Sequence, residues 1–406
     1  MPSSDKQNLS TCDDTPQKWR QHLLLDSPQS KPDCIWIHAC SFGEVASILP
    51  LASALHQQGY PLHITVITHT GMQHAQKHLS NIASISYLPW DLPTLMRRFV
   101  RKLQPYLLLL AETEFWPGML KACKREEVTV VGINTRISDR SFPKYHASRI
   151  LWQRWLSPIQ LFLPQSVQDA ERLQAIGIAP ERIHVAGNLK YAVSPPKVDA
   201  ESLRKRLDPS LIRPILLLAS THHDEESRLL EMWATWHQVR PDLLTLMVPR
   251  HPERFDLVAE MIQQQGLHLS RWSDTDIMPN SDVILIDAMG ILQSLYAIAD
   301  IAFIGGSLAN IGGHNPIEAA VCGRGVITGA HTQNFKEIMQ HMQKHHVAVV
   351  TQSDHELETC ITRFLQHPED LQELHENAAL YMQDKSQALA NVLQHIKPYL
   401  PPSTCD

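Results

Sequence analysis

The sequence predicts two α/β domains, each built as a doubly wound parallel sheet with helices on both faces. Short apolar segments that suit buried strands alternate with amphipathic segments of helical period. This alternation stops near residue 193 and begins again near residue 215. Polar or glycine-rich sequences follow the apolar segments, and the ligands of such sheets bind beyond the carboxyl ends of the strands. We therefore expect the functional residues in those loops, facing a cleft between the two domains.

The composition fits an ordinary globular chain. Its 406 residues suffice for about two domains, and 43% hydrophobic with 19% charged residues is typical of globular proteins. The net charge of −6 argues against a general nucleic-acid binder. No apolar run approaches the roughly 18 residues of a membrane span, and the polar start holds no signal-peptide core. Seven widely spaced cysteines without a C-x-x-C pair predict reduced thiols.

We expect five segments along the chain, because strand and helix patterns are confined to two stretches. The expected segments are a polar, partly loose N-terminal segment (1–32), a first Rossmann-like domain (33–192), a linker rich in Pro, Ser and charge (193–213), a second Rossmann-like domain (214–384), and a C-terminal helix and tail (385–406).

Apolar runs and helical spacing place the elements of the first half. The expected strands are 34–39, 62–68, 82–88, 106–111, 128–133 and a short one at 183–185. The expected helices are 44–57, 70–79, 93–103, a segment around 120–124, and the whole of 142–163. Val45, Ile48, Ala52 and Leu55 illustrate the helical period, and Gly59 is a typical stop signal.

The same signals place the elements of the second half. The expected strands are 215–219, 243–248, 283–286, 301–304, 325–328 and 348–350. One expected helix starts within 220–226, and three others cover 258–265, 291–299 and 385–399. Strands alternating with helices in this way predict parallel sheets.

A glycine-rich loop, residues 303–318, follows one of these strands. Two Gly-Gly pairs allow backbone turns that a Cβ forbids, and a helix is expected to begin at Asn315 or Pro316. Free backbone N–H groups and a helix N-terminus favour an anion such as a phosphate. Glu318 suits ribose hydroxyls better than a phosphate. The alternative is a tight turn without a ligand.

Three carboxylates follow strands of the first half. Glu44 comes after a Ser-x-Gly loop and could take a proton from a hydroxyl. The alternative is that Glu44 only complements its own helix dipole. Glu112 and Glu114 follow a strand of four leucines, and strand alternation sends both to one side. Their alternative is a pair of exposed acids at a helix start.

Three cations also stand where strands end. Arg250 and His251 follow a strand of the second half, and the guanidinium of Arg250 suits a phosphate. Lys190, at the end of the first half, could reach a phosphate as well. The alternative for each is a surface ion pair, which stabilises little.

A basic and aromatic set in the first half contrasts with the acidic chain. Such a surface suits a membrane or an anionic amphiphile, and the alternative is a solvated helix face with buried Trp. The set comprises Arg97, Arg98, Arg101, Lys102, Lys144, Arg149, Arg154, Trp152 and Trp155.

Seven blocks, in one order from about residue 35 to 335, resemble the 3-deoxy-D-manno-octulosonic acid (Kdo) transferases. The blocks are 38–44 (His-Ala-Cys-Ser-Phe-Gly-Glu), 112–117 (Glu-Thr-Glu-Phe-Trp-Pro), 134–138 (Asn-Thr-Arg-Ile-Ser), 187–190 (Gly-Asn-Leu-Lys), 219–222 (Ala-Ser-Thr-His), 248–255 (Val-Pro-Arg-His-Pro-Glu-Arg-Phe), and the Gly-Gly segments of 305–318.

The resemblance implies a GT-B fold of two Rossmann-like domains. It implies transfer of Kdo from CMP-Kdo to a lipid A precursor (lipid IVA), with inversion, at the cytoplasmic face of the inner membrane of a Gram-negative bacterium. It implies no metal or cofactor and no nucleic-acid partner. By family pattern Glu44 is the general base, and Glu112 and Lys190 stabilise the transition state. The CMP site would comprise Arg250, His251, Gly290, Ile291, Leu292, Asn315, Pro316, Ile317 and Glu318.

The sequence departs from this family in three places. Residues 1–32 are polar where the family has an apolar anchor, so the basic, aromatic set or a partner would attach the chain to the membrane unless the start is truncated. Ile291 stands where an acidic residue is frequent, and His223-Asp224 replaces a usual Glu-Gly.

Three alternatives to this function remain open at this point. One is another GT-B glycosyltransferase or epimerase that uses a UDP-sugar. A second is a dinucleotide oxidoreductase, which the absence of G-x-G-x-x-G after the first strand disfavours. A third is a non-catalytic membrane-surface protein.

Overall fold

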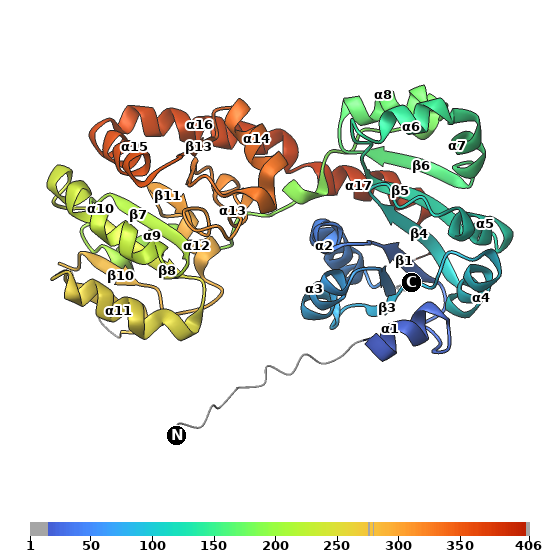
Figure 1. Cartoon of the computed structure of the whole chain (residues 1–406), viewed down its shortest axis with the longest axis horizontal. Helices are drawn as coiled ribbons and strands as arrows, with labels where there is room; N and C mark the ends of the chain where they lie inside the picture. Colours follow the sequence, from blue (N-terminus) through green and yellow to red (C-terminus); the bar gives the residue numbers. More distant parts are fainter. Residues whose placement is uncertain (1–14, 275–276, 279, 403–406) are drawn as a thin grey trace, which may run out of the picture. The chain divides into compact units, whose positions relative to one another are not determined.

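The computed structural model describes residues 15–274, 277–278 and 280–402, so residues 1–14 of the N-terminal segment that was expected to be partly loose (1–32) lie outside the described residues. The chain divides into two compact units (Figure 1). The first unit comprises Met1–Ala192 and Gln387–Asp406, and the second comprises Val193–Ser386.

The first unit holds a six-stranded sheet in the order β3-β2-β1-β4-β5-β6, with every described pairing parallel. Its strands are β1 (Cys34–His38), β2 (Leu62–Val66), β3 (Ser84–Tyr87), β4 (Pro105–Ala111), β5 (Thr129–Thr135) and β6 (Ile159–Pro164). Its helices are α1 (Thr15–His22), α2 (Phe42–Gln57), α3 (His69–Leu79), α4 (Pro93–Leu103), α5 (Pro117–Arg125), α6 (Phe142–Ala147), α7 (Arg149–Trp155), α8 (Val167–Ala175), α17 (Ala388–Ile396) and the 3-10 turns η1 (Pro180–Arg182), η2 (Leu189–Tyr191) and η5 (Lys397–Tyr399).

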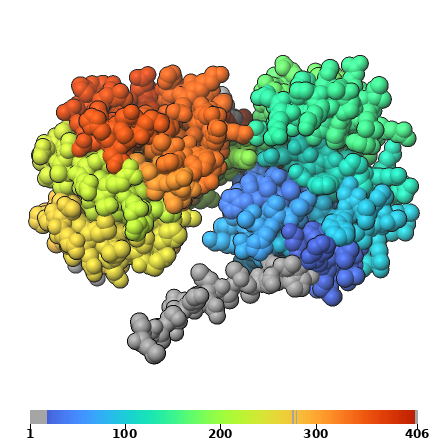
Figure 2. All heavy atoms as spheres, in the orientation of Figure 1, coloured from blue at the N-terminus to red at the C-terminus, as the bar shows by residue number. Residues whose placement is uncertain are grey.

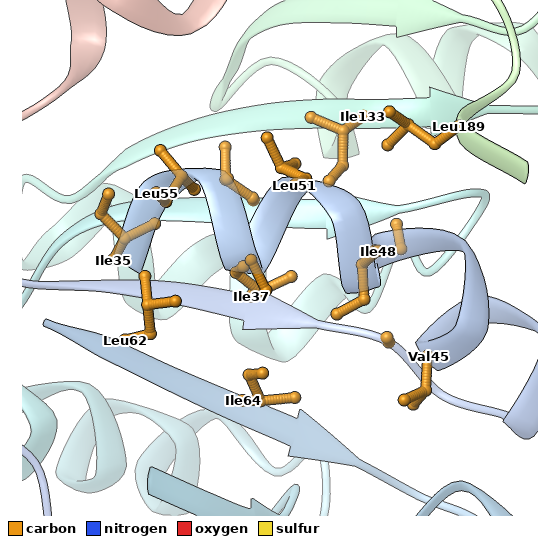
Figure 3. Close-up of a cluster of buried hydrophobic side chains, with 14 of the residues drawn as sticks. Ile35, Ile37, Val45, Ile48, Leu51, Leu55, Leu62, Ile64, Ile133 and Leu189 are labelled. Carbon is orange, nitrogen blue, oxygen red and sulfur yellow. The ribbon is translucent and has the colours of Figure 1, made fainter. Parts of the chain in front are cut away.

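The first unit has one apolar core on each face of its sheet. Successive strand residues point to opposite faces, so Ile35 and Ile37 join one core while Trp36 joins the other. Helix α2 contributes Val45, Ile48, Leu51 and Leu55 to the first core (Figure 3). Helix α17 adds Val392 and Ile396 to the same core, which ties the end of the chain to the first unit. Helices α4 and α5 cover the opposite core.

The second unit holds a seven-stranded sheet in the order β13-β12-β11-β7-β8-β10-β9, again with every described pairing parallel. Its strands are β7 (Ile215–Thr221), β8 (Leu244–Pro249), β9 (Leu269–Arg271), β10 (Val283–Leu285), β11 (Ile301–Ile304), β12 (Val326–Thr328) and β13 (Ala348–Val350). Its helices are α9 (Ala200–Leu207), α10 (Glu225–Val239), α11 (Phe255–Gln264), α12 (Leu292–Tyr296), α13 (Ile317–Ala320), α14 (Lys336–Lys344), α15 (Asp354–Gln366), α16 (Pro368–Lys385) and the 3-10 turns η3 (Pro252–Arg254) and η4 (Gln333–Phe335).

Strands β11, β7 and β8 are neighbours in the middle of this sheet, and their carboxyl ends therefore meet at one edge. Leu216 and Leu218 of β7 and Phe303 of β11 lie in a core with the indoles of Trp233 and Trp236 from α10. This packing fixes the loops that follow the three strands.

The structure corrects several element predictions. The helix expected over 142–163 is the two helices α6 and α7 and ends at Trp155, whereas Ile159–Pro164 forms the largely buried strand β6, whose backbone pairs in parallel with β5. The strand expected at 183–185 is a single bridge between Phe162 and Ile183. Residues 193–213, expected as a linker, belong to the second unit and contain α9. The helix expected over 385–399 is present as α17 followed by the turn η5, and it begins at Ala388 because Lys385 ends α16 of the other unit.

None of the described helices combines the length and the apolar composition that crossing a bilayer requires.

Candidate active site

Glu44 stands in the first turn of α2, where local sequence fixes its carboxylate. The backbone N–H of Cys40 donates to Oε2 at 2.7 Å, and the Ser41 hydroxyl donates to Oε1 at 2.9 Å. This resembles a capping box, in which an acid in the first turn reaches back to donors before the helix. The alternative role of Glu44, that of an acid which stabilises the start of its own helix, is therefore present in part.

The surroundings of Glu44 disfavour its charge in spite of these donors. The side chain is buried, with 9% of the residue exposed. Burial first, and then the negative charges of Glu114 and Glu112, raise the pKa of Glu44 to about 7. A carboxylate in this range changes protonation state near neutral pH, which suits a general base.

Glu114 is held in the opposite state by three polar neighbours. Its Oε2 accepts a 2.8 Å hydrogen bond from the Trp116 indole N–H and lies 3.8 Å from Nε2 of the buried His38. Burial opposes the charge of Glu114, but the contacts with His38, Trp116 and Cys40 outweigh it and lower the pKa of Glu114. Two neighbouring carboxylates thus have pKa values displaced in opposite directions, a pattern typical of catalytic sites.

Cys40, Glu44 and Glu114 place one potential metal-ligand atom each within 4.8 Å of one another. Burial first, and then both carboxylates, raise the pKa of the Cys40 thiol to about 12. Because metals bind the thiolate, this arrangement favours a hydrogen-bonded cluster over a metal centre.

Glu112 and Lys190 form an ion pair, with Lys190 Nζ 3.2 Å from Glu112 Oε1. Glu112 directly follows β4 and has a left-handed backbone with φ of 53°. Such a conformation is uncommon for a residue other than glycine and often marks a functional site. Strand alternation therefore ends at Ala111, and the predicted pairing of Glu112 with Glu114 on one strand face does not follow from the pleat.

A chain of amide hydrogen bonds positions the turn that carries Lys190. Asn134, buried at the end of β5 with φ of 50°, accepts the Leu189 N–H at its Oδ1 (2.9 Å). The Gln165 amide donates to the Asn134 backbone oxygen, and its own oxygen accepts from Asn188, both at 2.9 Å. Asn188 in turn accepts the Lys190 N–H at 2.9 Å. Asn134 and Asn188 lie in sequence blocks that had marked this site, whereas Gln165 carried no local signal.

The second unit contains a pocket of about 420 Å³ beyond the ends of β7 and β8. Four of the predicted nucleotide-site residues line it, namely Arg250, Gly290, Leu292 and Glu318. The remaining lining residues are Val193, Ser220, Val248, Pro249, Ala288, Met289 and Gln293. The side chain of Arg250 makes no hydrogen bond or ion pair with any described residue, so its donors are available to a ligand.

Among the described residues that line this pocket, Glu318 is the one acid. Burial raises the pKa of Glu318, while a hydrogen bond from Asn315 Nδ2 (3.2 Å to Oε1) and the charge of Arg250 oppose the rise. Asn315 also accepts the Ile317 N–H, so it supports Glu318 and the start of α13 together. Pro316 and Ile317 are buried and His251 and Ile291 lie outside the lining, so these predicted residues do not border the pocket.

The glycine-rich loop after β11 corrects one expectation from sequence. Its backbone N–H groups do bind an anion, but that anion is the buried carboxylate of Glu225, the first residue of α10. Gly306, Ser307 and Leu308 donate at 2.7–2.9 Å, Ala309 donates at 3.4 Å, and His222 adds a fifth N–H at 3.0 Å. The donors of residues 306–309 are therefore occupied inside the protein, and sequence spacing gave no sign of this pairing.

Comparison with known proteins assigns the chain to a family. Residues 17–193 match the family model described as 3-Deoxy-D-manno-octulosonic-acid transferase (kdotransferase). A 3-deoxy-D-manno-octulosonic acid transferase of Haemophilus influenzae is 35% identical over 91% of this chain and 88% of that protein. One of Bordetella pertussis is 34% identical over 75% of this chain and 72% of that protein.

Solved structures bear on the fold. The chain resembles the UDP-GlcNAc 2-epimerase of Neisseria meningitidis with a TM-score of 0.53, over 90% of this chain and 99% of that one, at 12% identity. A domain described as the C-terminal CMP-Kdo binding domain of WaaA from Acinetobacter baumannii is 32% identical over 45% of this chain and 96% of that one, with a TM-score of 0.43. The predicted GT-B fold and the family resemblance are both confirmed. The chain is a glycosyltransferase that belongs to the 3-deoxy-D-manno-octulosonic acid transferase family.

Proposed function

We propose that this enzyme transfers Kdo from CMP-Kdo to a lipid A precursor of the lipid IVA type, with inversion at the anomeric carbon and Glu44 as the general base. The observation that carries the proposal is the carboxylate of Glu44, which is held by Cys40 and Ser41 and has a pKa of about 7. Near neutral pH such a group can accept the proton of an attacking hydroxyl.

The donor nucleotide would occupy the pocket of the second unit. Arg250 offers an uncommitted guanidinium to a phosphate, and Glu318 offers acceptors to ribose hydroxyls. Bond cleavage in CMP-Kdo leaves negative charge on CMP and positive character at the anomeric carbon. Arg250 would stabilise the leaving group during this step.

Lys190 and Glu112 would act on the developing charges in the transition state. Each is more than two-thirds shielded from solvent, with exposed side-chain fractions of 28% and 18%. Their mutual pairing holds both charges in place before the substrate arrives, so little reorganisation is needed during the reaction. We propose no metal or cofactor for this chemistry.

The acceptor is a lipid, and we propose that α6 and α7 bring the enzyme to the cytoplasmic face of a Gram-negative inner membrane. This α6–α7 patch comprises Lys144, Arg149, Ile150, Leu151 and Arg154, all of them exposed. Its segment lies at the surface of the first unit, in green in Figure 2. Ile150 is 79% exposed, and the neighbouring Trp152 and Trp155 stack edge to face. Apolar side chains among cations suit an anionic lipid surface.

Helix α4 is a weaker candidate for this contact. Arg97 and Arg101 both pair with Glu126, at 2.6 and 3.0 Å, and Lys102 donates to Ser27. Three of the α4 cations that the sequence suggested for membrane contact are therefore engaged by other residues of the first unit.

A direct assay tests the proposal. The purified chain would be incubated with CMP-Kdo and lipid IVA, and the lipid analysed by mass spectrometry. We expect addition of Kdo by the wild-type chain and none by Glu44→Gln, which should still bind CMP. The proposal is wrong if the lipid stays unmodified while UDP-sugars, and not CMP, protect the wild-type chain in a thermal-shift assay.

A further inference from the structure

Three histidines lie together beside Arg250 at the edge where the three central strands of the second sheet end. His222 follows β7, His251 follows β8, and His314 stands in the loop that follows β11. The rings of His222 and His314 are stacked with centroids 5.0 Å apart, and His251 meets His222 edge to face at 5.1 Å. None of the three lines the neighbouring pocket, so the cluster extends beyond the nucleotide site described above.

His222 and His314 are joined by a single hydrogen bond between their Nε2 atoms, 2.7 Å apart. One proton must lie between the two nitrogens, because two protons there would repel and none would leave two lone pairs in contact. The pair therefore holds at most one net positive charge, and in that state both Nδ1 atoms carry a hydrogen. Neither Nδ1 has a hydrogen-bond partner within the part of the chain that the structure describes.

The backbone beneath the pair is built to hold it. Glu225 Oε2 accepts the N–H of His222 and the N–H of Gly306, so one buried carboxylate fastens both loops. Gly306 has φ of 66°, and a Cβ there would lie 3.0 Å from the His314 ring and 3.5 Å from the His222 ring. Only glycine leaves room for the stacked pair at this point.

The surroundings of the pair are cationic. Burial first, and then His222, Arg250 and His251, lower the pKa of His314 to about 4. Burial also lowers the pKa of His222; Glu225 opposes this, and His251, Arg250 and Arg254 add to it. Arg254 is paired with Glu226, Glu225 is saturated by backbone donors, and His251 lies 3.6 Å from a carboxylate oxygen of Glu253. Arg250, His222 and His314 are thus left without an ion-paired carboxylate among the described residues. An incoming anion would supply that charge and draw a proton onto the pair.

The proposed donor carries two anionic groups, the phosphate of CMP and the carboxylate of its acidic sugar. Arg250 lines the pocket and suits the phosphate, while the histidines stand next to Arg250 and outside the pocket. We propose that His222, His314 and His251 form a second anion subsite, which binds the carboxylate of the donor sugar. This inference rests on the proposed function, because it needs a donor whose sugar is an acid.

Calorimetric titration of the full chain without acceptor tests the subsite, with CMP-Kdo, CMP and cytidine as the three probes. In His314→Gln and His222→Gln we expect the affinity for CMP-Kdo to fall at least about tenfold, the loss of one charge-assisted hydrogen bond, while the affinity for CMP stays within about twofold. Unchanged CMP binding also shows that the variants are folded. The matched control is His223→Gln, because His223 is in the same loop but its side chain is 74% exposed.

Titrations in buffers of different ionisation enthalpy add a second measurement. At pH 7.5 the wild-type chain should take up about one proton on binding CMP-Kdo, and the two variants should not, because the pair is the group that gains the proton. An equal loss of affinity for CMP-Kdo and CMP would assign the pair to the phosphate and overturn the inference. So would unchanged CMP-Kdo affinity in both variants. If the wild-type chain fails to bind CMP-Kdo, the proposed function itself fails and the subsite with it.

Discussion

Lys190 Nζ lies 3.2 Å from Glu112 Oε1, which joins two residues 78 positions apart in the sequence into one half-buried ion pair. The left-handed backbone of Glu112 and the amide chain from Asn134 through Gln165 and Asn188 set the two sides of this pair. The backbone and the amide hydrogen bonds therefore position this pair, which distinguishes it from an exposed ion pair held only by the attraction of its charges.

Lys190→Met should lower kcat/KM by about 100- to 1000-fold, the range seen when one preorganised transition-state contact is removed. Glu112→Gln should have a similar effect, and the double variant should lose little more than either single one if the two charges act as a unit. Steady-state kinetics with CMP-Kdo and lipid acceptor measure this. The matched control is the exposed Lys197→Met, which should retain activity. Losses that simply multiply would contradict a joint role.

The pH profile of transfer should report the state of Glu44. With a pKa of about 7, the ionised base becomes scarce below neutrality, so kcat/KM should fall as pH drops and level off above pH 8. Glu114→Gln removes a negative charge that raises the pKa of Glu44, so the midpoint should move to lower pH. Rates measured from pH 5 to 9 in constant ionic strength test this. A midpoint unmoved in Glu114→Gln would show that the charge of Glu114 does not raise the pKa of Glu44.

The comparison of sequence and structure has a physical pattern. Elements whose signal is local were predictable, as in α2, where apolar spacing and Gly59 mark the helix, and in β4, a run of four leucines. The error at β6 arose because the helical pattern of residues 142–155 was extended over the apolar run Ile159–Pro164, whereas pairing with β5 makes that run a strand. Glu225 was missed for a similar reason, since four of its five donors stand 81 to 84 positions away.

The candidate site shows the same division. Glu44, Glu112 and Arg250 could be named because each follows a strand end, where the topology gathers functional groups. Lys190 could be named from its sequence block, although the strand expected before it is only a single bridge at Ile183. The partners that set their state could not, because the contact of Glu114 with His38 and the support of Asn134 by Gln165 depend on register between strands. Such contacts are fixed by packing and not by local spacing.

Glu225→Gln should destabilise the second unit. A carboxylate that accepts five backbone N–H groups would be replaced by an amide whose NH2 group faces donors, which costs about 3 kcal/mol or more. Urea unfolding followed by circular dichroism measures the change. Glu231→Gln is the matched control, because Glu231 is exposed on the same helix α10 and should shift stability by no more than about 0.5 kcal/mol. Equal stabilities of the two variants would mean that the hydrogen bonds accepted by Glu225 do not contribute to the stability of the second unit.

Ile150→Asp combined with Leu151→Asp should weaken binding of the enzyme to vesicles that contain anionic lipid. Both side chains are exposed on α7, at 79% and 45%, and each would lose apolar contact and gain a repelled charge, so binding should fall by about tenfold or more. Vesicle co-sedimentation measures it. Leu380→Asp, 65% exposed on α16, is the control and should bind as the wild-type chain does. A water-soluble acceptor analogue should be used equally well by both variants.

Glu44→Gln should increase the stability of the folded chain at high pH, although it removes activity. Burial raises the pKa of Glu44 from 4.5 to about 7, so between these values the unfolded chain ionises while the folded chain keeps its proton. Wild-type stability therefore falls as pH rises from 4.5 to 7, by about 3 kcal/mol for a shift of roughly 2.5 units, and the loss persists above pH 7. Gln carries no charge and escapes this loss, but it accepts fewer hydrogen bonds from Cys40 and Ser41, so the net gain at pH 8 should be about 1–3 kcal/mol. Denaturant unfolding at pH 5 and pH 8 tests the sign. The gain in stability of Glu44→Gln over the wild-type chain must be larger at pH 8 than at pH 5. The reverse order would show that folding does not raise the pKa of Glu44.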